Sequence, residues 1–181
     1  MKRIACIVAA LALGLMAPGC ILTSGQIRID FDLPGFSATT SSAITGEQID
    51  LSTEEEYQDN KDKLEGLTDL AVLGKITNND TNPLKVEVWI TPDSTGHATD
   101  TALKANPKAV KLWGPFSLAA GATRVVDWNE SSKLFTSTGK AVLLNEVKGD
   151  GKFTAYVIGS TGTYNFSITK GVLVLVLDVK I

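Results

Sequence analysis

The stretch GVLVLVLDVKI, residues 171–181, is apolar at almost every position. In an extended strand, successive side chains point to opposite faces. One face would carry Val172, Val174 and Val176, and the other Leu173, Leu175, Leu177 and Val179. A strand that is apolar on both faces is covered on both. We therefore expect an opposing sheet on one side of it and, on the other, a helix over residues 53–65 or the region 131–148.

Residues 26–33 alternate strictly between apolar and polar side chains. The apolar positions are Ile27, Ile29, Phe31 and Leu33, and the polar ones are Gln26, Arg28, Asp30 and Asp32. A period of two is typical of a strand with one buried face. The segment predicts a strand that packs on the core and exposes its charged side.

Further short apolar runs separated by turn residues predict the rest of the fold. The expected strands are 67–77, 85–91, 110–113, 116–118, 123–128, 152–158 and 164–169. Residues 78–83 and 159–162 have the composition of turns and predict hairpins, whereas 34–46 and 92–108 predict loops. The fold class is mainly β: a two-layer antiparallel β-sandwich, immunoglobulin-like in general architecture, with one or two short helices.

Two segments have helical features. Ser52 and Glu55 have the spacing of a capping box, and the acidic residues that follow suit the positive end of a helix, so we expect one over 53–65. Residues 131–148 are ambiguous, because 141–147 fits either a short helix or an irregular strand.

The N-terminus has the parts of an export signal. Lys2 and Arg3 precede 13 apolar residues, 4–16, which are too few to span a bilayer. The sequence Met16-Ala-Pro-Gly-Cys20 then resembles the lipobox of bacterial lipoproteins, although Ala17 and Pro18 depart from the commonest residues. The resemblance implies cleavage before Cys20 and diacylglycerol on its thiol. It divides the chain into a signal peptide (1–19), a lipidated tether (20–25) and a single β-sandwich domain (26–181).

The alternative is ordinary secretory cleavage, with Cys20 incidental. Cysteine usage argues against it, because the other cysteine, Cys6, lies within the signal and an exported domain with one cysteine forms no internal disulfide. Ile21 follows the cysteine, and in the resemblance the absence of Asp there implies the outer membrane of the bacterial cell envelope. The strand at 26–33 begins so soon after Cys20 that the folded body would lie close to the membrane.

Composition excludes one class of partner. The chain has 17 basic and 20 acidic residues, and without Lys2 and Arg3 the balance is 15 to 20, a net charge near −5. A mildly acidic surface without a cluster of basic and aromatic residues does not favour nucleic acid. We expect the membrane, through the lipid, and an envelope protein or a glycan as partners.

Residues for catalysis or for metal binding are sparse. The single histidine, His97, lies in a Ser/Thr/Gly-rich segment without a nucleophile motif, so we expect no enzyme, no cofactor and no metal. Asn78, Asp80 and Asn82 imitate the start of a calcium loop, but Pro83 occupies the required glycine position, which favours a turn. The acidic run at 54–56 has a sufficient structural role at a helix start.

Trp89 is the one candidate for ligand binding. It alternates in phase with Lys85, Glu87 and Thr91, and so lies on the polar face of its strand. An exposed indole there would suit a sugar or a protein partner, and the competing interpretation is that a helix or loop covers it. We therefore expect a non-enzymatic binding or structural module, with carbohydrate or peptidoglycan recognition around Trp89 as the alternative.

Overall fold

The computed structural model describes residues 24–33, 36–38, 44–92, 96–159 and 164–180. Its strands are β1 (Ser24–Leu33), β2 (Phe36–Ala38), β3 (Thr45–Asp50), β4 (Leu64–Asn78), β5 (Leu84–Thr91), β6 (Val110–Leu118), β7 (Thr123–Val126), β8 (Lys152–Gly159) and β9 (Phe166–Lys180). Its helices are the short 3-10 turns η1 (Leu51–Thr53) and η2 (Lys61–Lys63), α2 (Glu55–Asn60), α3 (Asp100–Ala105), α4 (Trp128–Ser132) and α5 (Ser137–Lys148).

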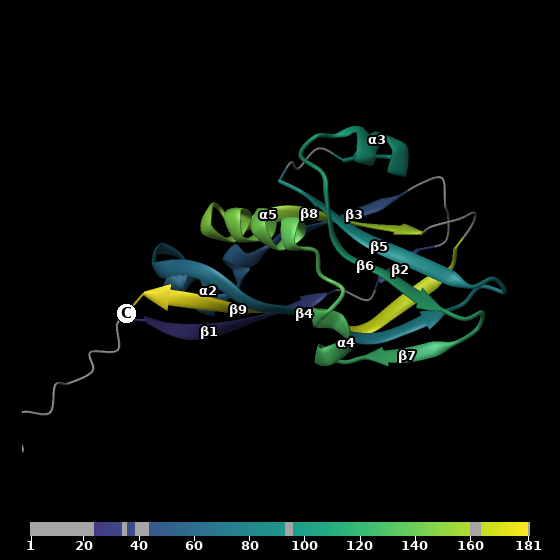
Figure 1. The fold of residues 1–181 in the computed structure, drawn as a ribbon, viewed down its shortest axis with the longest axis horizontal. Coiled ribbons are helices and arrows are strands. Elements are labelled where there is room, and N and C mark those ends of the chain that lie inside the picture. Colours follow the sequence, from purple (N-terminus) through teal and green to yellow (C-terminus); the bar gives the residue numbers. More distant parts are fainter. Residues whose placement is uncertain (1–23, 34–35, 39–43, 93–95, 160–163, 181) are drawn as a thin grey trace, which may run out of the picture.

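The strands form two antiparallel sheets packed face to face, which confirms the expected sandwich (Figure 1). Sheet A has the order β1-β9-β4-β7, with β2 also paired to β9, and sheet B has the order β3-β8-β5-β6. Both orders place strands from the two ends of the sequence side by side, as in a jelly roll. The general architecture is that of an immunoglobulin domain, but the strand order differs from the one that such domains have.

β9 lies inside sheet A between β1 and β4, as its two apolar faces require. Its leucines, Leu173, Leu175 and Leu177, are buried between the sheets. The expected helical cover on the other face is wrong, because α2 packs beside β1 and α5 packs mainly on β6. Val174 is nevertheless fully buried, and it lies in register between Asp30 of β1 and Ala71 of β4. The helix α4 packs on β4, where the indole N–H of Trp128 donates to Asp69 Oδ2 at 2.8 Å.

Both predicted hairpins are wrong. The segments 67–77 and 85–91 belong to β4 in sheet A and β5 in sheet B, and 152–158 and 164–169 belong to β8 in sheet B and β9 in sheet A. Turn-forming residues do reverse the chain at 78–83, but their composition does not determine whether the next strand pairs with the previous one or crosses to the opposite sheet.

Several element boundaries also differ from the expectation. The predicted loops 34–46 and 92–108 contain β2, the start of β3, and α3. The two short strands predicted on either side of Gly114-Pro115 form a single strand, β6, which continues through a cis peptide bond at that step. β9 is likewise continuous across 166–180, with Lys170 at φ 54° where the pairing with β4 shifts register.

The helix expected over 53–65 is shorter and begins differently. Asp50, and not Ser52, caps the first turn, because its carboxylate accepts hydrogen bonds from the backbone N–H of Ser52 at 3.0 Å and from its hydroxyl at 2.5 Å. The ambiguous region resolves into the helix α5. Thr136 caps α5 by accepting the Gly139 N–H at 2.9 Å, as is usual for an N-terminal threonine.

The first and last described strands end side by side. Ser24 at the start of β1 pairs with Lys180 at the end of β9, so both lie at the same end of the sandwich (Figure 1). The helix α2 and the start of β4 lie at this end too, since Leu64 pairs with Val179. None of the helices that the structure describes has the length and apolar character needed to cross a membrane.

Candidate functional site

The sequence singles out two residues, Cys20 and Trp89. Cys20 lies outside the described residues. Trp89 lies on the outer face of sheet B and is partly buried, with Tyr156 of β8 and Lys111 of β6 opposite it in register. Its indole N–H donates to Glu87 Oε2 at 3.1 Å, and Lys111 Nζ lies 3.5 Å from Glu87 Oε1.

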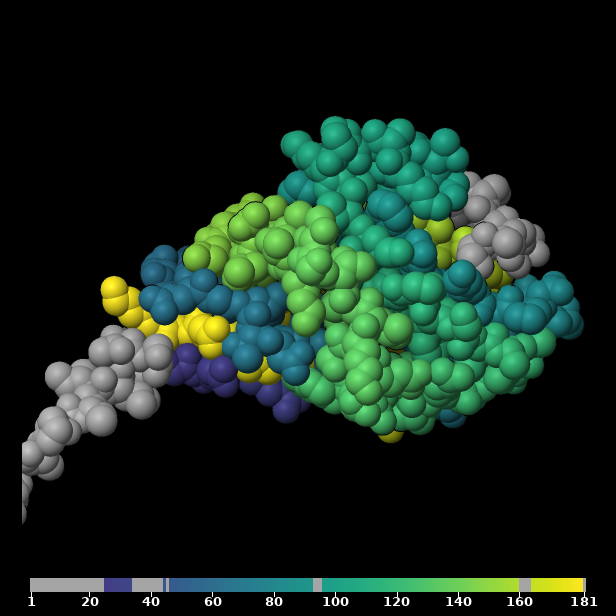
Figure 2. Space-filling model, in the orientation of Figure 1, coloured from purple at the N-terminus to yellow at the C-terminus, as the bar shows by residue number. Residues whose placement is uncertain are grey.

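A small apolar cluster covers part of this outer face. Trp89 and Ala109 pack against the buried side chains of Ile44, Leu103, Tyr156 and Ile158. Leu103 comes from α3, which stands on the sheet as a separate cap in Figure 2, and Lys104 Nζ lies 5.9 Å from the centre of the indole. Trp89 is therefore a half-covered side chain and not an open platform, and its ligand-binding role stays a prediction.

The lone histidine belongs to the same cap. The ring of His97 meets that of Tyr156 edge to face at 5.6 Å, and its Nε2 lies 3.2 Å from Asn106 Nδ2. No carboxylate contacts the ring among the interactions of the described residues. These contacts give His97 a structural role in holding the segment that contains α3 against sheet B.

The imitation calcium loop is a turn. Asn78 Oδ1 accepts the backbone N–H of Asp80 at 3.0 Å, and Asp80 Oδ1 accepts that of Asn82 at 3.1 Å. The side chain of Asn78 also donates to Asn82 O at 2.8 Å. The oxygens that a cation would need are thus occupied by backbone donors. In the part of the chain that the structure describes, no group of three or more His, Cys, Asp or Glu side chains is arranged to hold a metal ion.

The acidic run lies beside the edge strand β1. Glu54 and Glu56 flank a shallow, open cleft that they share with Arg28 and Asp30. Arg28 donates from two of its nitrogens to the carboxylate of Asp30, at 2.6 and 2.7 Å, so the one cation of the cleft is already paired. The arrangement is that of a solvated face.

Shifted pKa values mark structural contacts and not a reactive centre. Hydrogen bonds from Thr68 and Gln26 lower the pKa of Asp178. A hydrogen bond from Lys104 lowers the pKa of Asp100. Burial raises the pKa of Tyr57 and Tyr164. Groups with shifted pKa values often gather at active sites, but these lie on different elements and do not converge on one cavity.

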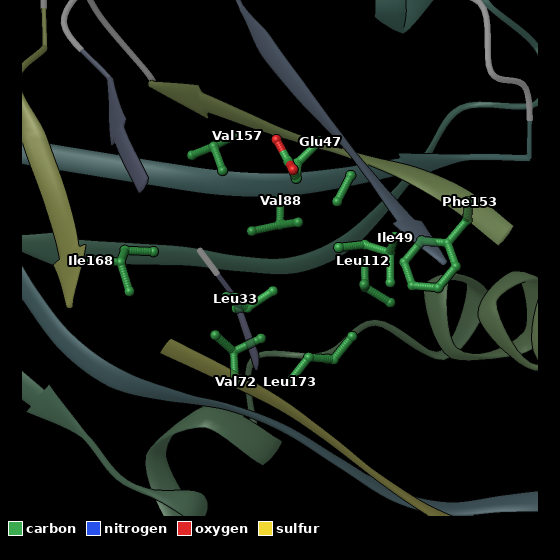
Figure 3. A pocket seen from close by; sticks show the side chains of 11 residues that line it. Leu33, Glu47, Ile49, Val72, Val88, Leu112, Phe153, Val157, Ile168 and Leu173 are labelled. Carbon is green, nitrogen blue, oxygen red and sulfur yellow. The ribbon is translucent and has the colours of Figure 1, made fainter. Parts of the chain in front are cut away.

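The sequence did not predict an apolar cavity of about 90 Å³ between the two sheets (Figure 3). Sheet A contributes Leu33, Val72, Ile168 and Leu173 to its wall. Sheet B contributes Val88, Leu112, Phe153, Ala155 and Val157, together with Ile49 and Glu47 of the edge strand β3. Every lining side chain except Glu47 is apolar. The wall is therefore almost pure hydrocarbon, and Glu47 is the one lining residue that carries a carboxylate.

Comparisons with known proteins do not assign the chain to a family. No protein-family model matches the sequence, and no curated protein matches it significantly. Three solved structures of viruses are 12% identical to the chain. A chain of Desmodium yellow mottle tymovirus matches over 86% of this chain and 88% of its own, with a TM-score of 0.30. A chain of the mud crab tombus-like virus matches over 87% of this chain and 82% of its own, with a TM-score of 0.38. A chain of the T13 IBDV viral particle matches over 88% of this chain but 36% of its own, with a TM-score of 0.34. At this identity and these TM-scores, the matches carry no argument about the family or the function of the chain.

Proposed function

We propose that the chain is a lipid-anchored protein of the bacterial cell envelope whose β-sandwich is a non-enzymatic binding or structural module acting next to the membrane. The lipobox-like sequence that ends at Cys20 carries the proposal. Its expected location is the outer membrane, and its expected partners are an envelope protein or a glycan.

The length of the tether supports a position close to the membrane. Three residues separate Cys20 from Ser24, where β1 begins. Four Cα-to-Cα steps span at most about 14 Å in an extended chain. An acylated Cys20 would therefore hold the end of the sandwich that carries Ser24 and Lys180 within that distance of the lipid.

The acidic charge of this end favours attachment through the lipid and not through the protein surface. Residues 54–65, around α2, carry six acidic side chains and two basic ones, Lys61 and Lys63. Anionic headgroups attract basic segments and repel acidic ones. The acidic residues of this segment would not attract an anionic surface, so membrane association would depend on acyl chains, each buried CH₂ of which contributes about 0.8 kcal/mol.

The test compares two cysteine variants of the full chain expressed in a bacterium. We expect wild-type protein and Cys6→Ser, the matched control, to lose residues 1–19, gain the mass of the lipid and sediment with membranes. Cys20→Ser should lack the lipid mass and leave the membrane fraction. Intact mass spectrometry of the three proteins is the readout. A mature wild-type chain with unmodified Cys20 would refute the anchor.

A second candidate, glycan recognition, is favoured by one observation. Trp89 is only partly buried on the outer face of sheet B, and Glu87 and Lys111 lie beside its indole. Aromatic faces with nearby polar groups suit sugars. If Trp89 binds glycan, Trp89→Phe should weaken retention on isolated peptidoglycan at least about tenfold, the scale of a binding hot spot, while Trp128→Phe should not. Equal retention of both variants and the wild type would discard this function.

A further inference from the structure

We propose that the cavity between the sheets is a binding site for one short aliphatic chain whose cationic or hydrogen-bond-donating end lies at Glu47. The inference rests on the proposed role as a binding module, and it gives the chemical class of the ligand. It does not depend on acylation of Cys20.

The first observation is incomplete closure of the sandwich. Inner faces of packed sheets are normally buried, at a density that leaves few voids. Leu70 and Leu175, on the inner face of sheet A, are fully buried. Val72, Val88 and Val157 also face inward, yet they are only partly buried and line the cavity. Other described residues therefore leave part of the inner surface uncovered.

The second observation is the chemistry of the wall. A polar group that enters an apolar site without a hydrogen bond is unfavourable, and a buried water needs two to four polar partners. Ten of the eleven lining side chains are apolar, and Glu47 is the exception. The interior therefore suits neither water nor a polar ligand. A hydrocarbon chain needs no hydrogen-bond partner in the wall, so it is the occupant that suits the cavity.

The third observation is size and shape. Packed sheets lie about 10 Å apart, and their side chains normally fill that space. The cavity of about 90 Å³ is smaller than the ~150 Å³ apolar cavity that accommodates a benzene ring, and equals about three water volumes of ~30 Å³. An unbranched chain of a few carbons fits such a space better than a ring does.

The fourth observation is the position of Glu47. It faces inward from the edge strand β3, in phase with Ile49, and its side chain is exposed (Figure 3). An inward-pointing charge on an edge strand also protects that edge from pairing with another chain. A charge of either sign would protect the edge. Binding a positive or hydrogen-bond-donating head group requires a negative charge, so edge protection and head-group binding can be tested separately.

The experiment titrates the full chain, held in lipid nanodiscs so that no free detergent competes, with n-pentylamine, 1-pentanol and pentanoate at pH 7. Methyl NMR of valine, leucine and isoleucine reports binding. We expect saturable shifts at Val88 and Val157, with affinity in the order amine, alcohol, pentanoate. No saturable shift with any of the three probes would overturn the site.

Variants separate the cavity from the rest of the molecule. Ala155→Leu should fill the cavity and weaken binding of all three probes more than about tenfold, and Val88→Ile, which adds one methyl group, provides the same test with less risk to folding. Val125→Leu on β7, at a side chain that is 70% exposed, is the matched control and should bind as the wild type does. Unchanged binding in both filled variants would show that the probes bind elsewhere.

The head group is tested at Glu47. Glu47→Gln should weaken n-pentylamine about two- to fivefold, as expected for an exposed charge pair, and leave 1-pentanol unchanged. Glu47→Lys should reverse the order of n-pentylamine and pentanoate, and an unchanged order would refute the assigned head group. If Cys20 is acylated and no probe binds, the cavity proposal is refuted and the lipid anchor stands. If the probes bind but Cys20 is unmodified, the lipid anchor is refuted and the cavity proposal stands.

Discussion

The ring of Tyr156 packs directly on Gly46, its register partner on the edge strand β3. A Cβ atom on Gly46 would come within 2.5 Å of Cε1 and 2.9 Å of Cδ1 of the ring. The other two tyrosines of the chain, Tyr57 and Tyr164, pack in the same way on Gly151 and Gly159. Strand glycines are usually weak points, and an aromatic ring that covers them restores contact area. Each tyrosine ring therefore occupies the space that a Cβ atom would take if the glycine were replaced.

Gly46→Ala should destabilise the domain by about 1–3 kcal/mol, the cost of overpacking. The ring of Tyr156 would have to move, and with it the contact to His97 and the cluster under α3. Urea denaturation followed by circular dichroism measures the change. Gly96→Ala is the control, because a Cβ there meets nothing within 4 Å and should leave the midpoint nearly unchanged. Equal midpoints for the two variants would contradict the packing argument.

Two tyrosine hydroxyls should respond oppositely to removal. Tyr57 Oη donates to Val147 O at 3.0 Å, whereas Tyr164 Oη is the one buried side-chain oxygen or nitrogen of the described residues without a hydrogen-bond partner. Tyr57→Phe should cost about 1 kcal/mol, and Tyr164→Phe should be neutral or stabilising by up to about 1 kcal/mol, because it removes an unpaired polar group. Thermal unfolding of both variants side by side checks the sign. A loss of stability in Tyr164→Phe would show that its hydroxyl has a partner.

Ser131 should be the most sensitive serine. It is fully buried in α4, its Oγ accepts the backbone N–H of Val72 at 2.7 Å and the indole N–H of Trp113 at 3.2 Å, and it thereby ties β4 to β6. Ser131→Ala would leave the Val72 N–H unpaired, at a cost of about 1–3 kcal/mol. Ser137→Ala, at an exposed position of α5, is the control. Hydrogen exchange at Val72 should quicken in the first variant and not in the second.

Asp50 should make stability dependent on acid pH. Hydrogen bonds from Lys152, at 2.7 Å, and from Ser52 lower the pKa of its carboxyl. Because the folded-state pKa is the lower one, the stabilisation is present above the ordinary Asp value of about 3.9 and is lost as the pH falls through the folded-state pKa.

Asp50→Asn should therefore lose less stability than the wild type between about pH 5 and pH 2. Asp32→Asn, on the exposed face of β1, should follow the wild-type curve. Thermal unfolding midpoints across this pH range provide the comparison. Parallel curves for wild type and Asp50→Asn would show that Asp50 does not contribute.

The elements that the sequence predicts well are those whose pattern depends on burial alone. The alternation from Ile27 to Leu33 predicts β1, and the two apolar faces around Val174 and Leu175 predict an interior strand. Trp113, in the predicted strand 110–113, is 2% exposed, and its indole N–H donates to the backbone oxygen of Ser131. In each case one side chain and its immediate neighbours carry the information.

Long-range choices were beyond the same reasoning. The turn at 78–83 reverses the chain whether β5 joins sheet A or sheet B, because the two Asx hydrogen bonds that form it, at Asn78 and Asp80, are local. The helix α3 is six residues long and buries one leucine, Leu103, which gives no helical period to detect. The cavity arises where small side chains of sheet B, such as Ala155 and Val88, face Val72 of sheet A, and only the packing of the two sheets brings them together.

The adjacency of Ser24 and Lys180 has a practical consequence for anyone attaching a reporter to this protein. A fluorophore joined beyond Lys180 would occupy the same side as the proposed lipid and would crowd the bilayer. One attached at Thr81, in the exposed turn after β4, would sit near the opposite tip of the sandwich and leave that side clear.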